Sequence, residues 1–236
     1  DNTAMRILVI DDEKPTLSMF KLFLTAYGYE VYTAEDGEKG LSLFEAFHPE
    51  MVFTDIKMPG MDGLEVLRRI KQSRKDTQVI IITGHGDMEK AVEALDLDAS
   101  DFINKPVERQ ALTSALARAE KRKQMPDTAR FSCRSDVQDL RLDIAINGKL
   151  QRQQKADFSR ELDLADSYPV DRAVLSFDEG FSIDRSGIRL LMSLIQELAK
   201  RNVPVVMENL SYNYVRIFQM AGMEKYAALK PVSPDE

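Results

Sequence analysis

Five short apolar runs rich in β-branched residues recur through the first half of the chain, and helical patterns lie between them. The runs are RILVI (6–10), VYTA (31–34), MVFT (51–54), VIIIT (79–83) and DFINK (101–105). Unbroken apolar stretches such as 79–82 are typical of strands covered on both faces, as in a parallel sheet. Five such repeats within residues 1–122 predict a doubly wound, five-stranded parallel α/β domain.

Four segments of this half have helical patterns. PTLSMFKLFLTAYG (15–28) begins with a proline suited to a first helical turn and ends with a glycine suited to a C-terminal cap. GLEVLRRIKQ (63–72) and MEKAVEALDL (88–97) follow. ERQALTSALARAEKRK (108–123) places Leu112, Ala115, Leu116 and Ala119 on one stripe, which predicts an amphipathic helix.

The pattern changes after residue 122. KQMPDTAR (123–130) is polar, contains a proline and has no apolar period, so we expect a linker there. In 131–236, FSCRS (131–135) and LRLDIAI (140–146) predict a hairpin-like pair of strands. A helix at about 153–167, a strand at 173–177, a helix from Ser186, a strand at 203–207, a helix within 211–222 and a short terminal strand follow. This order predicts a second α/β domain with a mixed sheet and helices largely on one face.

Charge and composition limit the classes of partner. The chain has 236 residues and a formal net charge of −7, which argues against broad affinity for nucleic acid or anionic membranes. No apolar run approaches the roughly 20 residues that span a bilayer. One cysteine cannot form an internal disulfide, which fits a reducing compartment. We therefore expect a cytoplasmic protein.

Polar residues gather where four predicted strands end. Asp11 and Asp12 follow the first strand, Asp55 follows the third, and Thr83 and Lys105 end the fourth and fifth. Ligand sites of open parallel sheets form at this edge. Three carboxylates there favour a Mg²⁺ site, and the lysine and hydroxyl suit a bound phosphoryl group. Taken singly, each residue has an ordinary explanation as a helix cap, a turn residue or a surface charge.

These residues carry a family resemblance. ILVIDDE, TDIKMPGMDG, IIITGHGD and DFINKP resemble the receiver domain of bacterial response regulators, which has a flavodoxin-like fold. The resemblance implies that Asp55 accepts phosphate from a sensor histidine kinase or a phosphotransfer protein. It implies that Asp11, Asp12, Asp55 and the backbone carbonyl of Lys57 hold Mg²⁺.

The same resemblance assigns further roles. Asp55, Thr83 and Lys105 would assist phosphorylation, and Thr83 and Phe102 would form a switch pair. In that pair the hydroxyl moves toward the phosphate and the ring fills the space left behind. Phe102 also has an ordinary explanation as a core residue. Pro106 matches a proline that usually follows a cis bond in this family.

The second half resembles the STAS domain of anti-sigma factor antagonists, over about residues 131–230. The likeness is strongest at Asp184, Ser186 and Gly187 within FSIDRSGIRLL, and it implies that Asp184–Gly187 contact a partner. It further implies an anti-sigma factor with serine kinase activity that phosphorylates Ser186, and a phosphatase that reverses the step. Arg185 stands where the family often has serine or threonine, and Ser176 where it commonly has Asp or Asn.

Ser186 has two interpretations that are compatible. Asp184 or Ser186 could cap the following helix by accepting an amide hydrogen bond. Ser186 could also be phosphorylated, and the phosphate would add a charge of about −1.5 to −2 at a docking surface.

We therefore expect a response regulator in which Asp55 controls a STAS module that switches protein partners. It would not be an enzyme beyond assisting its own phosphorylation and dephosphorylation. The alternatives are a DNA-binding output half, a nucleotide-binding output half, and a scaffold in which Ser186 is only a helix cap and the partner binds the unmodified protein. Residues 130–236 contain 15 basic and 16 acidic side chains, with no Arg/Lys-rich helix, which disfavours DNA binding. Formation of a homodimer stays open.

Overall fold

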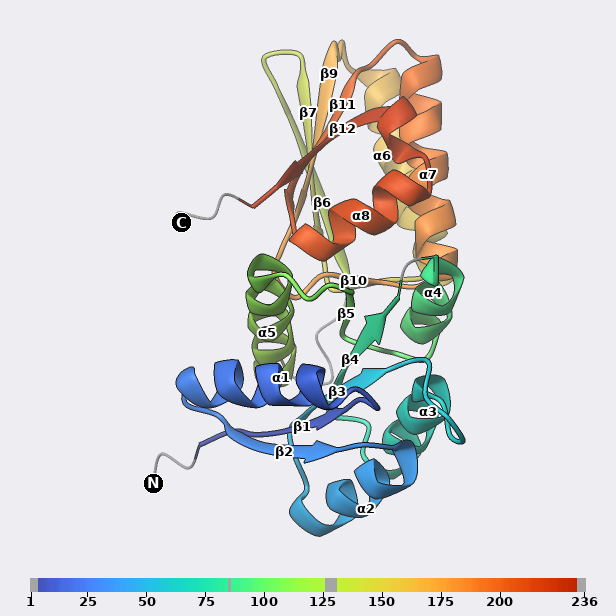
Figure 1. Ribbon diagram of the computed structural model, residues 1–236. Helices are drawn as coiled ribbons and strands as arrows, with labels where there is room; N and C mark the ends of the chain where they lie inside the picture. Colours follow the sequence, from blue (N-terminus) through green and yellow to red (C-terminus); the bar gives the residue numbers. More distant parts are fainter. Residues whose placement is uncertain (1–3, 85, 126–130, 233–236) are drawn as a thin grey trace. The chain divides into compact units, whose positions relative to one another are not determined.

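The chain folds into two compact units, Asp1–Gln124 and Met125–Glu236. The computed structural model describes residues 4–84, 86–125 and 131–232. Each unit has a five-stranded sheet and its own buried core (Figure 1). Among the described residues, no helix combines the length and the apolar character needed to cross a membrane.

The first unit has a parallel sheet, as predicted. Its strands are β1 (Arg6–Ile10), β2 (Glu30–Ala34), β3 (Met51–Asp55), β4 (Gln78–Thr83) and β5 (Asp101–Asn104). They lie in the order β2-β1-β3-β4-β5, and every neighbouring pair is parallel. This is the order of a doubly wound sheet, in which the strand order reverses beside β1. All residues of β3 and β4 are buried, which explains their unbroken apolar runs.

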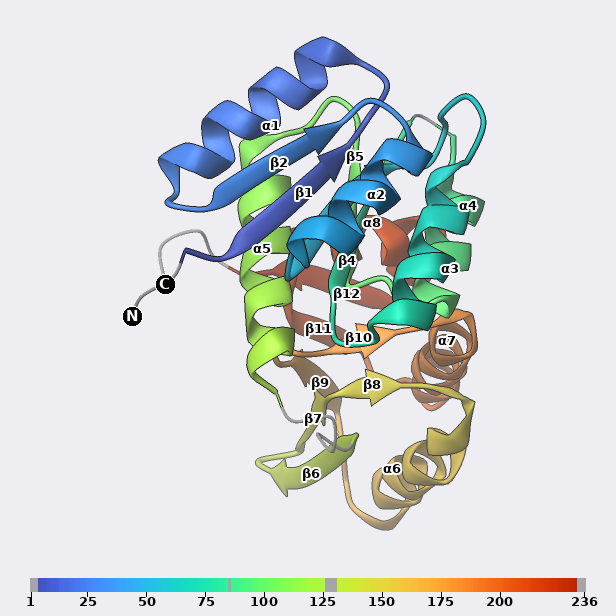
Figure 2. The same cartoon turned by 90° about the horizontal axis from the view of Figure 1, so that it is seen from below.

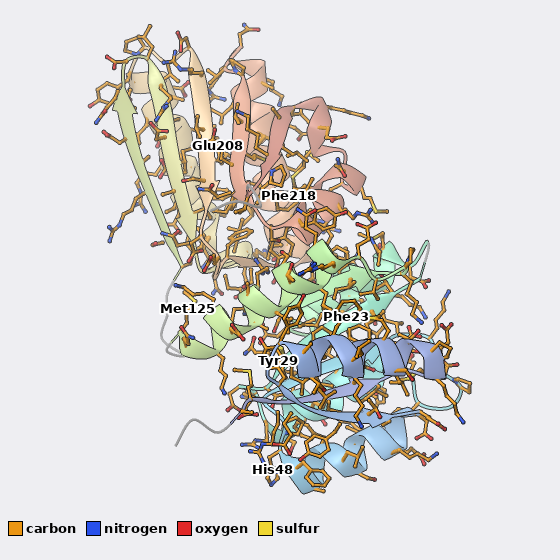
Figure 3. The ribbon with its side chains drawn as sticks, turned by 60° about the vertical axis from the view of Figure 1, so that its left-hand side comes forward. Phe23, Tyr29, His48, Met125, Glu208 and Phe218 are labelled. Atoms are coloured by element: carbon orange, nitrogen blue, oxygen red, sulfur yellow. The ribbon has the colours of Figure 1, made fainter. Side chains whose placement is uncertain are left out.

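Five helices cover this sheet. They are α1 (Lys14–Ala26), α2 (Gly37–Phe47), α3 (Gly63–Ser73), α4 (Met88–Asp96) and α5 (Arg109–Gln124). Helices α1 and α5 lie on one face, and α2, α3 and α4 lie on the other (Figure 2). Tyr29, which precedes β2, donates a hydrogen bond from its hydroxyl to Glu120 of α5 (Figure 3).

Helix α2 was not among the helices that the sequence predicted. Asp36 caps it by accepting a hydrogen bond from the Lys39 amide at 2.8 Å. A Cβ on Gly40 would lie 2.3 Å from Cδ1 of Ile10, so the glycine allows the helix to approach β1 closely. Gly40, which lowers helix propensity, is therefore required by packing against the sheet.

The second unit has the predicted mixed sheet. Its strands are β6 (Ser132–Gln138), β7 (Arg141–Asn147), β9 (Arg172–Phe177), β11 (Val205–Leu210) and β12 (Ala227–Pro231). The order is β12-β11-β9-β7-β6, with β6 and β7 antiparallel and the other neighbours parallel. Asp139 and Leu140 join β6 to β7 with positive φ angles, as a two-residue hairpin requires.

The helices α6 (Lys155–Ser167), α7 (Arg185–Lys200) and α8 (Tyr212–Met220) cover one face of this sheet (Figure 1). Phe218 of α8 is fully buried (Figure 3), with the rings of Phe177 and Tyr214 nearby. A short parallel pair, β8 (Lys149–Leu150) and β10 (Ser182–Ile183), was not predicted. Single turns of 3-10 helix occupy Arg152–Gln154 and Met223–Lys225.

The expected linker 123–130 overlaps the end of α5, because Lys123 and Gln124 are helical. Its residues 126–130 lie outside the described residues.

Candidate functional site

The carboxyl edge of the first sheet brings the predicted acidic residues together. Asp11 and Asp12 directly follow β1, and Asp55 ends the neighbouring strand β3. One carboxylate oxygen from each of these three residues lies within 4.8 Å of the other two. Asp11 and Asp55 are buried, whereas Asp12 is exposed. The parallel sheet therefore concentrates three negative charges at one point.

Lys105 balances part of this charge. It follows β5, and its Nζ lies 3.0 Å from Oδ2 of Asp55 and 3.1 Å from Oδ2 of Asp11. Glu13, which sequence reasoning did not single out, places Oε1 at 3.7 Å from the same nitrogen. The Lys105 ammonium thus forms ion pairs with the two buried carboxylates of Asp11 and Asp55. The peptide bond between Lys105 and Pro106 is cis.

Burial and mutual repulsion shift the protonation of the site. Burial raises the pKa of Asp11 above its ordinary value, and the charge of Asp55 raises it further. Burial also raises the pKa of Asp55, against the lowering effect of Lys105. Burial alone would lower the pKa of Lys105, but the facing carboxylates of Asp55 and Asp11 raise it overall. One lysine therefore does not neutralise the pocket.

The pocket fits a hard divalent cation. Oδ2 of Asp11 is buried and lies 3.1 Å from the Lys105 ammonium, while Oδ1 of the same group accepts the amide of Glu13 at 2.8 Å. One ammonium among three carboxylates leaves negative charge in a partly buried pocket, and a divalent cation bound there would compensate for that cost. Carboxylate oxygens are ligands that Mg²⁺ prefers. Asp11, Asp12 and Asp55 are thus an acidic triad of the kind that binds Mg²⁺.

Lys57 contacts two parts of the site. Its amide donates a hydrogen bond to the Asp55 carboxylate, which lowers the pKa of Asp55. Its ammonium lies 2.8 Å from Oδ1 of Asp87, which joins the loop after β3 to the loop after β4. The predicted ligand role of its backbone carbonyl stays a prediction.

The two residues of the expected switch pair are both buried. Thr83 ends β4, and its hydroxyl donates a hydrogen bond of 2.6 Å to Oδ1 of Asn104. Phe102 of β5 is 1% exposed. Sequence reasoning missed Asn104, because the contact depends on the register that sets Asn104 beside Thr83.

In the second unit, Ser186 and Asp184 lie at the start of α7. Asp184 is the N-cap: its Oδ1 accepts the amide of Gly187 at 2.8 Å. Ser186 donates its hydroxyl to the same oxygen at 2.7 Å and accepts the amide of Arg152 at 2.9 Å. The side chain of Ser186 therefore ties the start of α7 to the turn that precedes α6. Arg185 is the first residue of α7 and is half-buried.

Gly187 is required by a close approach between backbones. A Cβ at this position would lie 2.1 Å from the carbonyl oxygen of Leu150 in β8. The Asp-x-Ser-Gly step therefore contains a cap, a hydroxyl that bridges two segments, and a glycine that allows α7 to contact β8. The contacts of Arg152 and Leu150 were not predicted, because no local pattern indicates contacts between segments so far apart in the sequence.

Comparisons with known proteins match both units. Residues 7–117 match the response regulator receiver domain family, and residues 99–235 match the STAS domain family. The two matches overlap at β5 and the first half of α5.

Two curated relatives illustrate the extent of the likeness. The chain is 37% identical to the regulatory protein AtoC of Escherichia coli over 114 residues, which are 48% of this chain and 25% of AtoC. It is 30% identical to the response regulator MprA of Mycobacterium avium over 156 residues, which are 66% of this chain and 68% of MprA. This chain therefore spans only a quarter of the AtoC sequence.

Among solved structures, a response regulator receiver domain protein from Clostridium thermocellum is 40% identical. The match has a TM-score of 0.49 and covers 51% of this chain and 97% of that one.

Proposed function

Because the chain belongs to the response regulators and joins a receiver domain to a STAS domain, we propose that a phosphoryl group on Asp55 controls partner binding by the STAS domain. The observation that carries this proposal is the pocket itself. A buried acceptor carboxylate lies against a second buried carboxylate, an exposed one and a lysine.

The proposed chemistry is phosphoryl transfer from a phosphohistidine of a sensor kinase or a phosphotransfer protein. An oxygen of Asp55 attacks phosphorus, the P–N bond breaks, and the imidazole leaves and takes a proton from solvent. Lys105 is positioned to pair with the negative charge that develops on the phosphoryl group. The hydroxyl of Thr83 can donate a hydrogen bond to that group once its hydrogen bond to Asn104 is broken. Mg²⁺, held by Asp11, Asp12, Asp55 and the carbonyl of Lys57, would supply charge neutralisation.

The phosphoryl group is then lost to water. A water oxygen attacks phosphorus, the P–O bond to Asp55 breaks, and inorganic phosphate leaves with the proton that water gives up. We propose that the chain acts on no other substrate, so that the receiver assists only its own modification. The proposed place of action is the cytoplasm.

The output half acts by partner switching of the anti-sigma factor antagonist type. Its partners would be an anti-sigma factor with serine kinase activity and a phosphatase. Phosphate on Ser186 would replace the hydrogen that Asp184 accepts and would set a dianion beside that carboxylate. Repulsion between the two would weaken the Arg152 contact and alter the surface at Asp184–Gly187.

Two other output classes remain as rivals. A DNA-binding output would give a gel shift that weakens with salt, and a nucleotide-binding output would release or absorb heat with ATP or GTP. The near balance of 15 basic and 16 acidic side chains in 130–236 supports the partner-switching proposal over the first rival.

Phosphorylation of Asp55 is tested with acetyl phosphate as the donor. We expect one phosphoryl group per chain when Mg²⁺ is present, mapped to Asp55 by borohydride reduction and mass spectrometry. Asp55→Asn should take up none, whereas Asp76→Asn, which changes an exposed carboxylate elsewhere in the receiver, should behave as wild type. Equal labelling without the metal, or labelling that survives in Asp55→Asn, would contradict the proposal.

A further inference from the structure

The side chain of Asn104 accepts the hydroxyl hydrogen of Thr83. The distance from Oγ1 to Oδ1 is 2.6 Å, whereas the other acceptor near that hydroxyl, the carbonyl of Ile103, is 3.4 Å away. A hydroxyl has one hydrogen to donate. While Thr83 donates to Asn104, it therefore cannot donate to a group on Asp55.

The strand register explains why these side chains meet. Thr83 of β4 is the direct partner of Asn104 of β5, and Ile81 is the partner of Phe102. Residues two apart in a strand share a face, so Thr83, Asn104 and Phe102 lie on the same face of the sheet. Asn104 is half-buried while Thr83 is fully buried. Asn104 can exchange this hydrogen bond for water more readily than Thr83 can.

We propose that Asn104 is a positioning residue that holds Thr83 away from Asp55 in the unphosphorylated receiver. This inference rests on the proposed function at Asp55. The Thr83–Asn104 hydrogen bond stabilises only the resting arrangement, because donation to a phosphoryl group uses the same hydrogen. Removing the Asn104 amide therefore shifts the population toward the arrangement that binds the phosphoryl group.

The test uses beryllofluoride with Mg²⁺ on the full chain, with calorimetry as the readout of affinity. Asn104→Leu has a similar shape and no acceptor. We expect it to bind beryllofluoride roughly twofold to tenfold more tightly than wild type, the range set by the net contribution of one hydrogen bond. The direction is diagnostic, because a residue with a merely structural role would weaken binding when it is replaced.

A double-mutant cycle provides the control. In a Thr83→Ala background no hydroxyl remains to be held, so Asn104→Leu should leave the affinity of that variant unchanged. Asn104→Ala serves as a second variant if the leucine disturbs folding, and thermal unfolding checks each protein.

The outcomes separate this inference from the proposed function. If wild type binds beryllofluoride and Asp55→Asn does not, while Asn104→Leu and Asn104→Ala bind no more tightly than wild type, only the role of Asn104 is wrong. An equal gain in the Thr83→Ala background also overturns it. If wild type itself does not bind, both the role of Asn104 and the role of Asp55 are wrong.

Discussion

At the scale of single residues, burial raises the pKa of several acidic groups of this chain. In the receiver pocket, the cost of burying Asp11 and Asp55 is only partly offset by Lys105, which leaves both carboxyl groups with raised pKa values. In the STAS domain, burial also disfavours the charged form of Cys133, and the charge of Arg160 offsets this effect only in part. Burial raises the pKa of its thiol to about 12, and the nearby Glu161 carboxylate contributes.

The first prediction concerns Cys133, the one cysteine of the chain. Because its pKa rises from 9.0 to about 12, the folded protein should contain about a thousandfold less thiolate at pH 8.5 than an unshifted thiol. Alkylation by iodoacetamide at that pH should be correspondingly slow and should become fast in denaturant. Glu161→Gln should speed the reaction of the folded protein, since it removes a facing negative charge.

The same shift has a consequence for stability. The unfolded thiol loses its proton first as pH rises, so this group makes unfolding easier above pH 9. Cys133→Ser should lack that dependence. Rapid alkylation of the folded wild type at pH 8.5 would contradict the assignment.

At the scale of elements, the start of α7 combines a helix cap with a hydrogen bond to a second segment. Asp184 satisfies the amide of Gly187, and Ser186 joins the cap to the Arg152 amide. The cap acts within α7, whereas the serine acts between α7 and the turn before α6. Each substitution should therefore have a different effect.

The second prediction separates these two roles. Asp184→Ala should lower the free energy of unfolding of the STAS domain by about 0.5–2 kcal/mol, the usual cost of losing an N-cap. Ser186→Ala should cost less, because Asp184 still caps the Gly187 amide, although the hydrogen bonds of the Ser186 hydroxyl with Asp184 and with the Arg152 amide are lost. Urea unfolding followed by circular dichroism measures both values. A larger loss for Ser186→Ala than for Asp184→Ala would show that the serine, not the aspartate, stabilises the start of α7.

Some elements could be predicted from sequence and others could not, for physical reasons. Strands β3 and β4 of the receiver are buried along their whole length, so their apolar runs predict them directly. Helix α2 was missed because Asp36-Gly37 has the composition of a turn and Gly40 lowers helix propensity. Contact with Ile10 is what requires that glycine. The strands β8 and β10 have two residues each, too few for a period to show.

The candidate sites follow the same division. Asp11, Asp55, Thr83 and Lys105 could be foreseen because strand ends meet at one edge of a parallel sheet. Asn104, Glu13 and Arg152 could not, because their contacts depend on strand register or on segments that no local pattern joins.

At the scale of the whole molecule, the two domains each have their own core. A signal between them therefore requires that a change at Asp55 alters the conformation or the partner binding of residues 131–232. Population shift provides such a link when one arrangement of the receiver surface binds phosphate better than the other. The net charge of −7 should keep the protein from associating broadly with nucleic acid in either state.

The most direct test of this account measures hydrogen exchange across the full chain, with and without beryllofluoride and Mg²⁺. We expect the treatment to change amide exchange in the STAS domain of wild type, including the Asp184–Gly187 segment, and to change nothing in Asp55→Asn. Changes confined to the receiver, or changes in the STAS domain that persist in Asp55→Asn, would contradict the claim that the phosphoryl group on Asp55 controls the STAS domain.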